Sequence, residues 1–281
     1  AFRFNSEELK IELDAVIREH RVTPMLHTLF CAPVVRDGTV ETVLVENKDG
    51  RGAIRAGMYI DASADGDLFA RAGVPFTTDA HLQPPTTCAK IRNFDATALD
   101  YAAVYAARHR EFGLAPDAGW DCDIPGLPGI RMFAQTHVFD TDCSRADQLT
   151  HAEMEGRRQV RAVMDMLRKY GPPQADLALA ALPATIGIRE TRRFTAEYRL
   201  TEEDVLSGRR FDDAIAQGSY RVDIHYPDGG GFLFKYLDGT TQECRAGGVT
   251  RGRWRPPVPR DPTFYQIPYR TMVNRRLKNA I

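Results

Sequence analysis

The chain has 281 residues, of which 43% are hydrophobic and 27% charged. This length allows one large domain or two moderate ones, and these fractions are ordinary for a soluble globular protein. The formal net charge of −1 gives no overall field that would favour nucleic acid or an acidic membrane surface, and the longest apolar stretches are far shorter than a membrane span. We therefore expect neither nucleic acid nor a membrane as a partner, and leave a homo-oligomer open.

Five cysteines are scattered along the chain without a Cys-x-x-Cys pair. Zinc sites and redox motifs use such close pairs, and an odd number cannot form a full disulfide framework. Isolated thiols are typical of a reducing compartment, so we expect a cytoplasmic protein. The dispersed Cys and His residues predict no metal site.

The first expected element is a helix capped by Asn5 or Ser6. The apolar residues that recur at helical spacing in it are Leu9, Leu13, Val16 and Ile17. Apolar runs separated by Asp37-Gly38 and Asp49-Gly50 then predict a three-stranded meander, because Asp-Gly between such runs is a strong hairpin signal.

A strand, a small-residue turn and a helix are expected next. The strand covers residues 58–62, the turn 63–67 and the helix 68–72, which Gly73 ends. This topology places a ligand at the carboxyl end of a strand.

The middle of the chain contains three helix-capping signals. Asp95 caps one helix, Thr150-x-x-Glu153 opens a longer one, and Thr201-x-x-Asp204 opens a short one that Gly208 stops. A further short helix is expected at residues 211–216.

Strands and loops are expected around these helices. Residues 113–130 and 245–262 are rich in Gly and Pro and are expected to be loops. Strands are expected at 185–188 and 192–200, and a hairpin at 232–244.

Four segments in series resemble the family of FAD-dependent oxidoreductases with a glutathione-reductase-like flavin fold. They are residues 59–76, which are similar to the family's stretch IDATGDGDLAARAG, residues 82–87, residues 187–193 with 200–205, and residues 223–225 continuing to 265–270. The resemblance covers nearly the whole chain in the right order. It implies FAD as the cofactor and hydride transfer from an organic small molecule to the flavin.

The resemblance and the expected elements together indicate an α/β fold in two regions. Residues 1–95, with the β-meander and the strand-turn-helix, and residues 265–281 are expected to belong to an incomplete FAD-binding domain. Residues 96–264 are expected to form a substrate or cap domain of mixed α+β character. The family also has an early Gly-x-Gly-x-x-Gly turn, which binds the FAD pyrophosphate, and a strand beyond the position of Ile281. Neither is present in this sequence, so we expect a truncated chain that cannot hold FAD alone.

The resemblance places the cofactor site in the turn after the expected strand. The cofactor-binding candidates are Asp61, Ala62, Ser63, Asp65 and Gly66. The family's Ala-Thr-Gly reads Ala-Ser-Ala here, which puts the Cβ of Ala64 where the backbone would approach the dinucleotide. The alternative is a surface turn that uses Asp and Gly only for capping.

The substrate-binding candidates are Arg189, Arg192 and Gln83. On a strand, a period of two places Arg189 and Arg192 on opposite faces. A guanidinium group binds carboxylates through two hydrogen bonds, so one face could anchor an anionic substrate. The alternative is a structural network of ion pairs.

The catalytic candidates are Asp223 and His225, which share one face of an expected strand. A carboxylate beside His suits removal of a proton from a substrate hydroxyl while a hydride leaves for the flavin. The alternative is a structural His. Two other functions stay open: a non-catalytic binding module for an anionic or carbohydrate ligand, and a hydrolase that uses the same pair, which the lack of a Gly-x-Ser-x-Gly motif disfavours.

Overall fold

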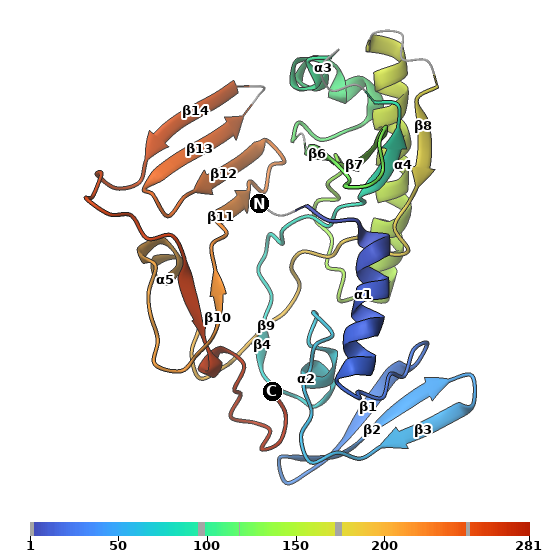
Figure 1. The fold of residues 1–281 in the computed structure, drawn as a ribbon, viewed down its shortest axis with the longest axis vertical. Coiled ribbons are helices and arrows are strands. Elements are labelled where there is room, and N and C mark those ends of the chain that lie inside the picture. The colour runs from blue at the N-terminus through green and yellow to red at the C-terminus, as the bar shows by residue number, and fades with distance from the viewer. Residues whose placement is uncertain (1–2, 95–98, 118, 172–175, 246–247) are drawn as a thin grey trace.

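The computed structural model describes residues 3–94, 99–117, 119–171, 176–245 and 248–281. The chain forms a mixed α/β structure in which several small antiparallel sheets are combined with few helices (Figure 1). Among the described residues, no helix has both the length and the apolar character needed to cross a bilayer.

The largest core lies between a four-stranded sheet and the long helix α4 (Ala146–Tyr170). The sheet has the order β6-β7-β5-β8, and its strands are β5 (Ala89–Arg92), β6 (Trp120–Asp123), β7 (Ile130–Ala134) and β8 (Ala178–Ala181). Ile91, Phe133 and Leu167 are fully or almost fully buried between sheet and helix. The short helices α3 (Tyr101–Arg108) and η1 (His109–Phe112) close one end of this core.

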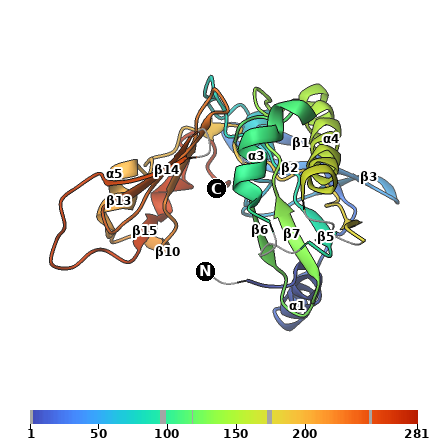
Figure 2. The ribbon, with the colours of Figure 1, turned by 90° about the horizontal axis from the view of Figure 1, so that it is seen from above.

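A second four-stranded sheet is a simple meander. It consists of β11 (Val222–His225), β12 (Gly231–Lys235), β13 (Thr240–Arg245) and β14 (Gly248–Arg253). Nearby lie α5 (Glu202–Ser207), the strand pair β10 (Ala214–Gly218) and β15 (Tyr265–Pro268), and η2 (Tyr269–Thr271). Figure 2 shows these strands standing to one side of the body that contains α3 and α4.

The beginning and the end of the chain share a third core. Its elements are the meander β1 (Leu29–Arg36), β2 (Thr39–Asn47) and β3 (Gly50–Ile54), the helix α2 (Asp67–Arg71), and the short pair β4 (Phe76–Thr77) and β9 (Arg193–Phe194). Helix α1 (Ser6–Glu19) precedes the meander and contributes no buried residue to this core. Tyr59 and Ala280 form a parallel bridge, and both are buried with Val40 and Leu68. The C-terminus therefore lies beside the strand-turn-helix segment (Figure 1).

Several sequence predictions are confirmed. The side chain of Asn5 caps α1 by accepting a hydrogen bond from the Glu7 N–H at 3.0 Å. The three-stranded meander, α2, and the hairpin of β12 and β13 are present. Thr201 and Asp204 form a capping box at α5, and Gly208 ends that helix in the left-handed conformation. The apolar face expected for α1 is not buried, because no residue of that helix lies in a core.

The capping box expected at residues 150–153 is wrong. Helix α4 begins at Ala146, so Thr150 and Glu153 lie inside it. The Thr150 hydroxyl donates to the Ala146 carbonyl at 2.7 Å, and the Glu153 carboxylate accepts from the Ile186 N–H at 2.7 Å. Helix α3 is capped by Asp100, and the expected cap Asp95 lies outside the described residues.

The segment 185–200 contains less strand than its sequence predicts. It has the two-residue strand β9 and an isolated bridge between Thr86 and Gly187. Its charged side chains bind other side chains and loop carbonyls, so they do not follow the two-residue alternation of a sheet.

Three further expectations are corrected by tertiary pairing. The helix expected at 211–216 is wrong, because residues 214–218 pair with β15. The two expected loops contain β6 and β14, which pair with β7 and β13. The expected strand at 58–62 is reduced to the single bridge of Tyr59.

Candidate functional site

A cavity of about 620 Å³ lies between the two four-stranded sheets. Its walls include the polar side chains of His137, Arg189, Asp223 and His225, together with Trp120 and Phe232. Cavities of this size, with apolar walls and a few converging polar groups, are typical small-molecule sites. The cavity contains three of the residues that the sequence indicated.

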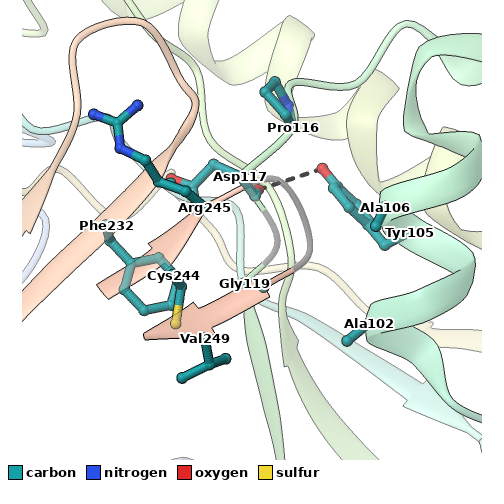
Figure 3. Close-up of a pocket in the computed structure, with 12 residues that line it drawn as sticks. Ala102, Tyr105, Ala106, Pro116, Asp117, Gly119, Phe232, Cys244, Arg245 and Val249 are labelled. Carbon is teal, nitrogen blue, oxygen red and sulfur yellow. Dashed lines mark hydrogen bonds between the residues drawn. The ribbon is translucent and has the colours of Figure 1, made fainter. Parts of the chain in front are cut away.

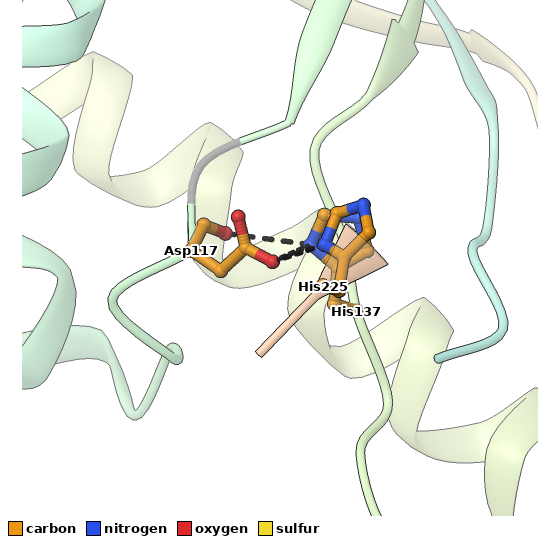
Figure 4. A group of neighbouring side chains, drawn as sticks. All are labelled: Asp117, His137 and His225. Atoms are coloured by element: carbon orange, nitrogen blue, oxygen red, sulfur yellow. Dashed lines mark hydrogen bonds and ion pairs between the residues drawn. The ribbon is translucent and has the colours of Figure 1, made fainter. Parts of the chain in front are cut away.

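Asp117, His137 and His225 converge at one side of this cavity (Figure 4). The Asp117 side chain has 0% exposure. One of its oxygens lies 2.5 Å from Nδ1 of His225 and 3.5 Å from Nδ1 of His137. The centroids of the two imidazole rings are 4.7 Å apart. A carboxylate that faces two ring nitrogens in a buried setting is an arrangement for holding a proton or a cation.

Buried hydrogen bonds fix the backbone of both histidines. His137 follows β7, and its N–H and carbonyl bind the side-chain amide of Gln159 on α4 at 2.9 and 3.0 Å. His225 ends β11, and its N–H donates to Oε1 of Gln83 at 3.1 Å. The hydroxyl of Tyr105 on α3 lies within hydrogen-bonding distance of the main-chain carbonyls of Ala115 and Asp117, at 2.8 and 3.4 Å.

His137 is held in its neutral form. Burial is the main reason that its pKa falls to about 4, because a charged imidazolium loses hydration when it is buried. The Asp117 carboxylate opposes this fall, and the positive charge of Arg189 adds to it.

Asp223 connects His225 with the cavity. One carboxylate oxygen lies 3.6 Å from Nε2 of His225 and 3.9 Å from the Arg189 guanidinium. The other accepts a hydrogen bond from the Tyr220 hydroxyl at 3.0 Å. The predicted pairing of Asp223 with His225 is therefore present, and Arg189 lies in the same site.

A second, smaller cavity of about 170 Å³ has Asp117 among its lining residues (Figure 3). Asp117 and Tyr105 line it from one side, and Cys244 and Arg245 of the second sheet line it from the other. Phe232 borders both cavities. Asp117 thus lines the smaller cavity, while the two histidines that it contacts line the larger one.

Two of the predicted substrate residues lie outside the larger cavity. Arg192 donates to the Asp65 carbonyl at 2.9 Å, the Asp67 carboxylate at 2.9 Å and the Ser144 carbonyl at 3.3 Å. The structural ion-pair alternative therefore describes Arg192. The Gln83 side chain accepts a hydrogen bond from the His225 N–H, so it positions the backbone of His225.

The expected cofactor turn is held by its own carboxylates. Asp61 accepts hydrogen bonds from the hydroxyl and N–H of Ser63 and from the N–H of Phe69. Asp65 accepts from the Thr191 hydroxyl at 2.7 Å. Because these carboxylates bind protein groups, they would not face a phosphate at the outer side of the turn.

The conformation of this turn explains the small residues at its tip. Ala64 has φ +67° and Gly66 has φ +64°, a left-handed region that strongly favours Gly. A Cβ on Gly66 would lie 2.1 Å from the Phe194 ring. Ala62, Ser63 and Ala64 are exposed, so the outer side of the turn is backbone and small side chains.

The model of the FAD dependent oxidoreductase family matches residues 2–281. The chain belongs to this family. FAD is the cofactor that this family uses, which agrees with the cofactor expected from the resemblance.

No curated protein matches the sequence. Among solved structures the chain is similar to CabE, an aromatic hydroxylase from angucycline biosynthesis, with 13% sequence identity and a TM-score of 0.36. The similarity covers 61% of this chain and 31% of that one, so the chain spans about a third of the length of the structure it matches.

Sequence reasoning missed two residues of the site. Asp117 lies in a segment that was expected to be a loop, and His137 follows a strand that was not expected. Neither residue lies in one of the four segments that carry the family resemblance, so only their convergence in the structure indicates a role.

Proposed function

We propose that this chain carries the substrate site of an FAD-dependent oxidoreductase, which oxidises a hydroxyl-bearing organic molecule. The strongest support comes from the surroundings of His225. Its Nδ1 is hydrogen-bonded to the buried carboxylate of Asp117, and its Nε2 lies beside Asp223 at the larger cavity. The hydrogen bond to Asp117 holds the proton on Nδ1, which leaves Nε2 free to accept a proton.

Bound FAD would supply the acceptor for a hydride from the carbon that carries the substrate hydroxyl. The chain's own residues handle the remaining proton. As the C–H bond breaks and the carbonyl forms, the hydroxyl proton passes to Nε2 of His225. The Asp117 and Asp223 carboxylates on either side stabilise the resulting imidazolium. Arg189 and the aromatic side chains of the cavity orient the substrate.

The cofactor site that we propose includes the turn of Asp61, Ala62, Ser63, Asp65 and Gly66. Its carboxylates bind protein groups, and its outer side is exposed backbone, which fits the close approach of a dinucleotide. Helix α2 has only five residues, so it offers a weak dipole to a pyrophosphate. We therefore propose that the turn is one wall of the FAD site and that the chain alone holds FAD weakly.

The regions 1–95 and 265–281 are proposed as the flavin side, and 96–264 as the substrate side. The shared core of Tyr59, Leu68 and Ala280 supports the first grouping. The proposed boundary near residue 96 falls outside the described residues, and the one near residue 264 lies within them.

Flavin fluorescence during an FAD titration tests the cofactor part of the proposal. Arg192→Ala should weaken FAD binding, because it removes the hydrogen bonds that hold the turn at Asp65 and Asp67. Arg189→Ala should leave FAD affinity unchanged. Anaerobic bleaching of FAD-loaded protein by hydroxyl-bearing compounds tests the reaction, and His225→Asn should slow it without changing flavin content. A protein that binds such compounds but never reduces FAD would instead support the binding-module alternative.

A further inference from the structure

The cluster of Asp117, His137 and His225 has the composition of a metal site. We propose that these three residues bind a divalent transition-metal cation such as Zn²⁺, an inference that goes beyond the proposed function. Their ligand atoms all lie within 4.8 Å of one another. Two imidazole nitrogens and one carboxylate oxygen form a donor set that suits Zn²⁺ and its neighbours in the first transition row.

The donors need little movement to share a cation. Metal–ligand distances near 2.1 Å require donor atoms roughly 3–3.5 Å apart. The carboxylate oxygen of Asp117 is already 2.5 Å and 3.5 Å from the two Nδ1 atoms. Both rings turn this same nitrogen toward Asp117 (Figure 4). A cation would replace the hydrogen bond between Asp117 and His225 and separate that pair slightly.

The Asp117 carboxylate has a second oxygen that is available to bind a cation. The second oxygen of Asp117 is buried and makes no hydrogen bond to any residue that the structure describes. A buried carboxylate oxygen without a partner is costly. A divalent cation would neutralise this charge and could engage either oxygen.

The surroundings of His225 resemble those of a metal-binding His. A His that binds a metal usually donates its other ring N–H to a carboxylate or carbonyl group. Nε2 of His225 faces Asp223 at 3.6 Å, and Gln159 holds the backbone of His137 on both sides. Three protein ligands next to a cavity leave a coordination position for water or a small molecule.

Metal binding and proton acceptance are alternative states of His225. With a cation on Nδ1, the ring carries its proton on Nε2 and donates it to Asp223. In the metal-free state Nδ1–H donates to Asp117, and Nε2 can accept. A bound cation would therefore prevent Nε2 of His225 from accepting the substrate proton in the proposed reaction.

Calorimetric titration of chelator-treated protein with Zn²⁺ tests the site without flavin or substrate. We expect one tight site per chain, and Co²⁺ in its place should give visible absorption bands of a low-symmetry nitrogen and oxygen site. His137→Asn and Asp117→Asn should each weaken Zn²⁺ binding by at least about 100-fold, since even the loss of an outer-shell partner costs 10–100-fold. The control His151→Asn changes an exposed His on α4 and should bind as the unmodified chain does.

Circular dichroism checks the fold of each variant, and His137→Asn decides the question if Asp117→Asn does not fold. The proposal is overturned if Zn²⁺ does not bind, or if Zn²⁺ binding survives His137→Asn, or if it is lost in His151→Asn. The proposed oxidoreductase function is tested separately, by flavin reduction on chelator-treated protein.

Discussion

Arg192 and Arg189 lie three residues apart, and replacing each by Ala gives a matched pair of perturbations. The Arg192 side chain is 13% exposed and joins the turn at residues 65–67 to the loop before α4. The Arg189 side chain is 28% exposed and has one ion pair at 3.9 Å. We expect Arg192→Ala to destabilise the fold and Arg189→Ala to leave it nearly unchanged.

The magnitude follows from the partners that each change removes. Hydrogen bonds to a charged group contribute about 1.5–3 kcal/mol each, and Arg192 makes three. The Asp67 carboxylate is 42% exposed, so water can hydrate it once Arg192 is removed. This hydration reduces the cost of losing the ion pair. We expect a cost of about 3 kcal/mol for Arg192→Ala. An isolated ion pair at the edge of a cavity contributes at most about 1 kcal/mol, which bounds the cost of Arg189→Ala.

Urea unfolding followed by circular dichroism measures both changes, and thermal unfolding supports it. A domain of this size loses roughly 2–4 °C in Tm per kcal/mol, so Arg192→Ala should lower Tm by roughly 6–12 °C. Arg192→Lys keeps the charge but loses the planar fork and should fall between Ala and Arg. Equal losses for the Ala variants of Arg192 and Arg189 would refute the reasoning.

Three other changes test the turn and a helix cap by urea unfolding. Ala64→Gly should raise the free energy of unfolding by about 0.5–1 kcal/mol, because a left-handed L-residue is strained; an unchanged or lower value would contradict that conformation. Gly66→Ala should lower it by more than about 2 kcal/mol, because the new Cβ meets the ring of Phe194, and a neutral result would exclude this contact. Burial alone would raise the pKa of Asp204, but hydrogen bonds led by the Thr201 N–H lower it to about 2. The folded-state pKa lies below the unfolded one, so the stabilisation is present above about pH 4 and lost as pH falls through 2. Asp204→Asn should therefore cost about 2 kcal/mol at pH 7 and little at pH 2, and a cost independent of pH would show that the charge has no part in it.

Local signals predicted the fold where a few neighbouring residues decide the structure. The Asp-Gly turns of the first meander and the capping box of Thr201 with Asp204 need no distant partner. The same motif failed at Thr150 and Glu153, because a capping pattern does not reveal whether the helix has already begun. Strands such as β6 and β10 were missed because their hydrogen-bond partners are distant in sequence or lie on unpredicted strands.

The candidate site was predicted in part for the same reason. Asp223 and His225 are two residues apart on one strand, so the alternation of side chains brought them together correctly. Asp117 and His137 reach His225 from 108 and 88 positions away, and no periodicity relates such distant residues. Family resemblance indicated the cofactor but carried no information on this cluster.

The segment from Arg189 to Arg193 links the two proposed sites. Arg192 holds the turn of the flavin side, while Arg189 lies three residues earlier in the wall of the substrate cavity. Between them, the Glu190 carboxylate accepts from the N–H of Gln83, whose side chain accepts from the N–H of His225. Because these contacts run through four consecutive residues, a shift of the segment by one position would move the turn and the imidazole together. In the proposed arrangement, the distance between cofactor and proton acceptor therefore depends on the backbone of this segment.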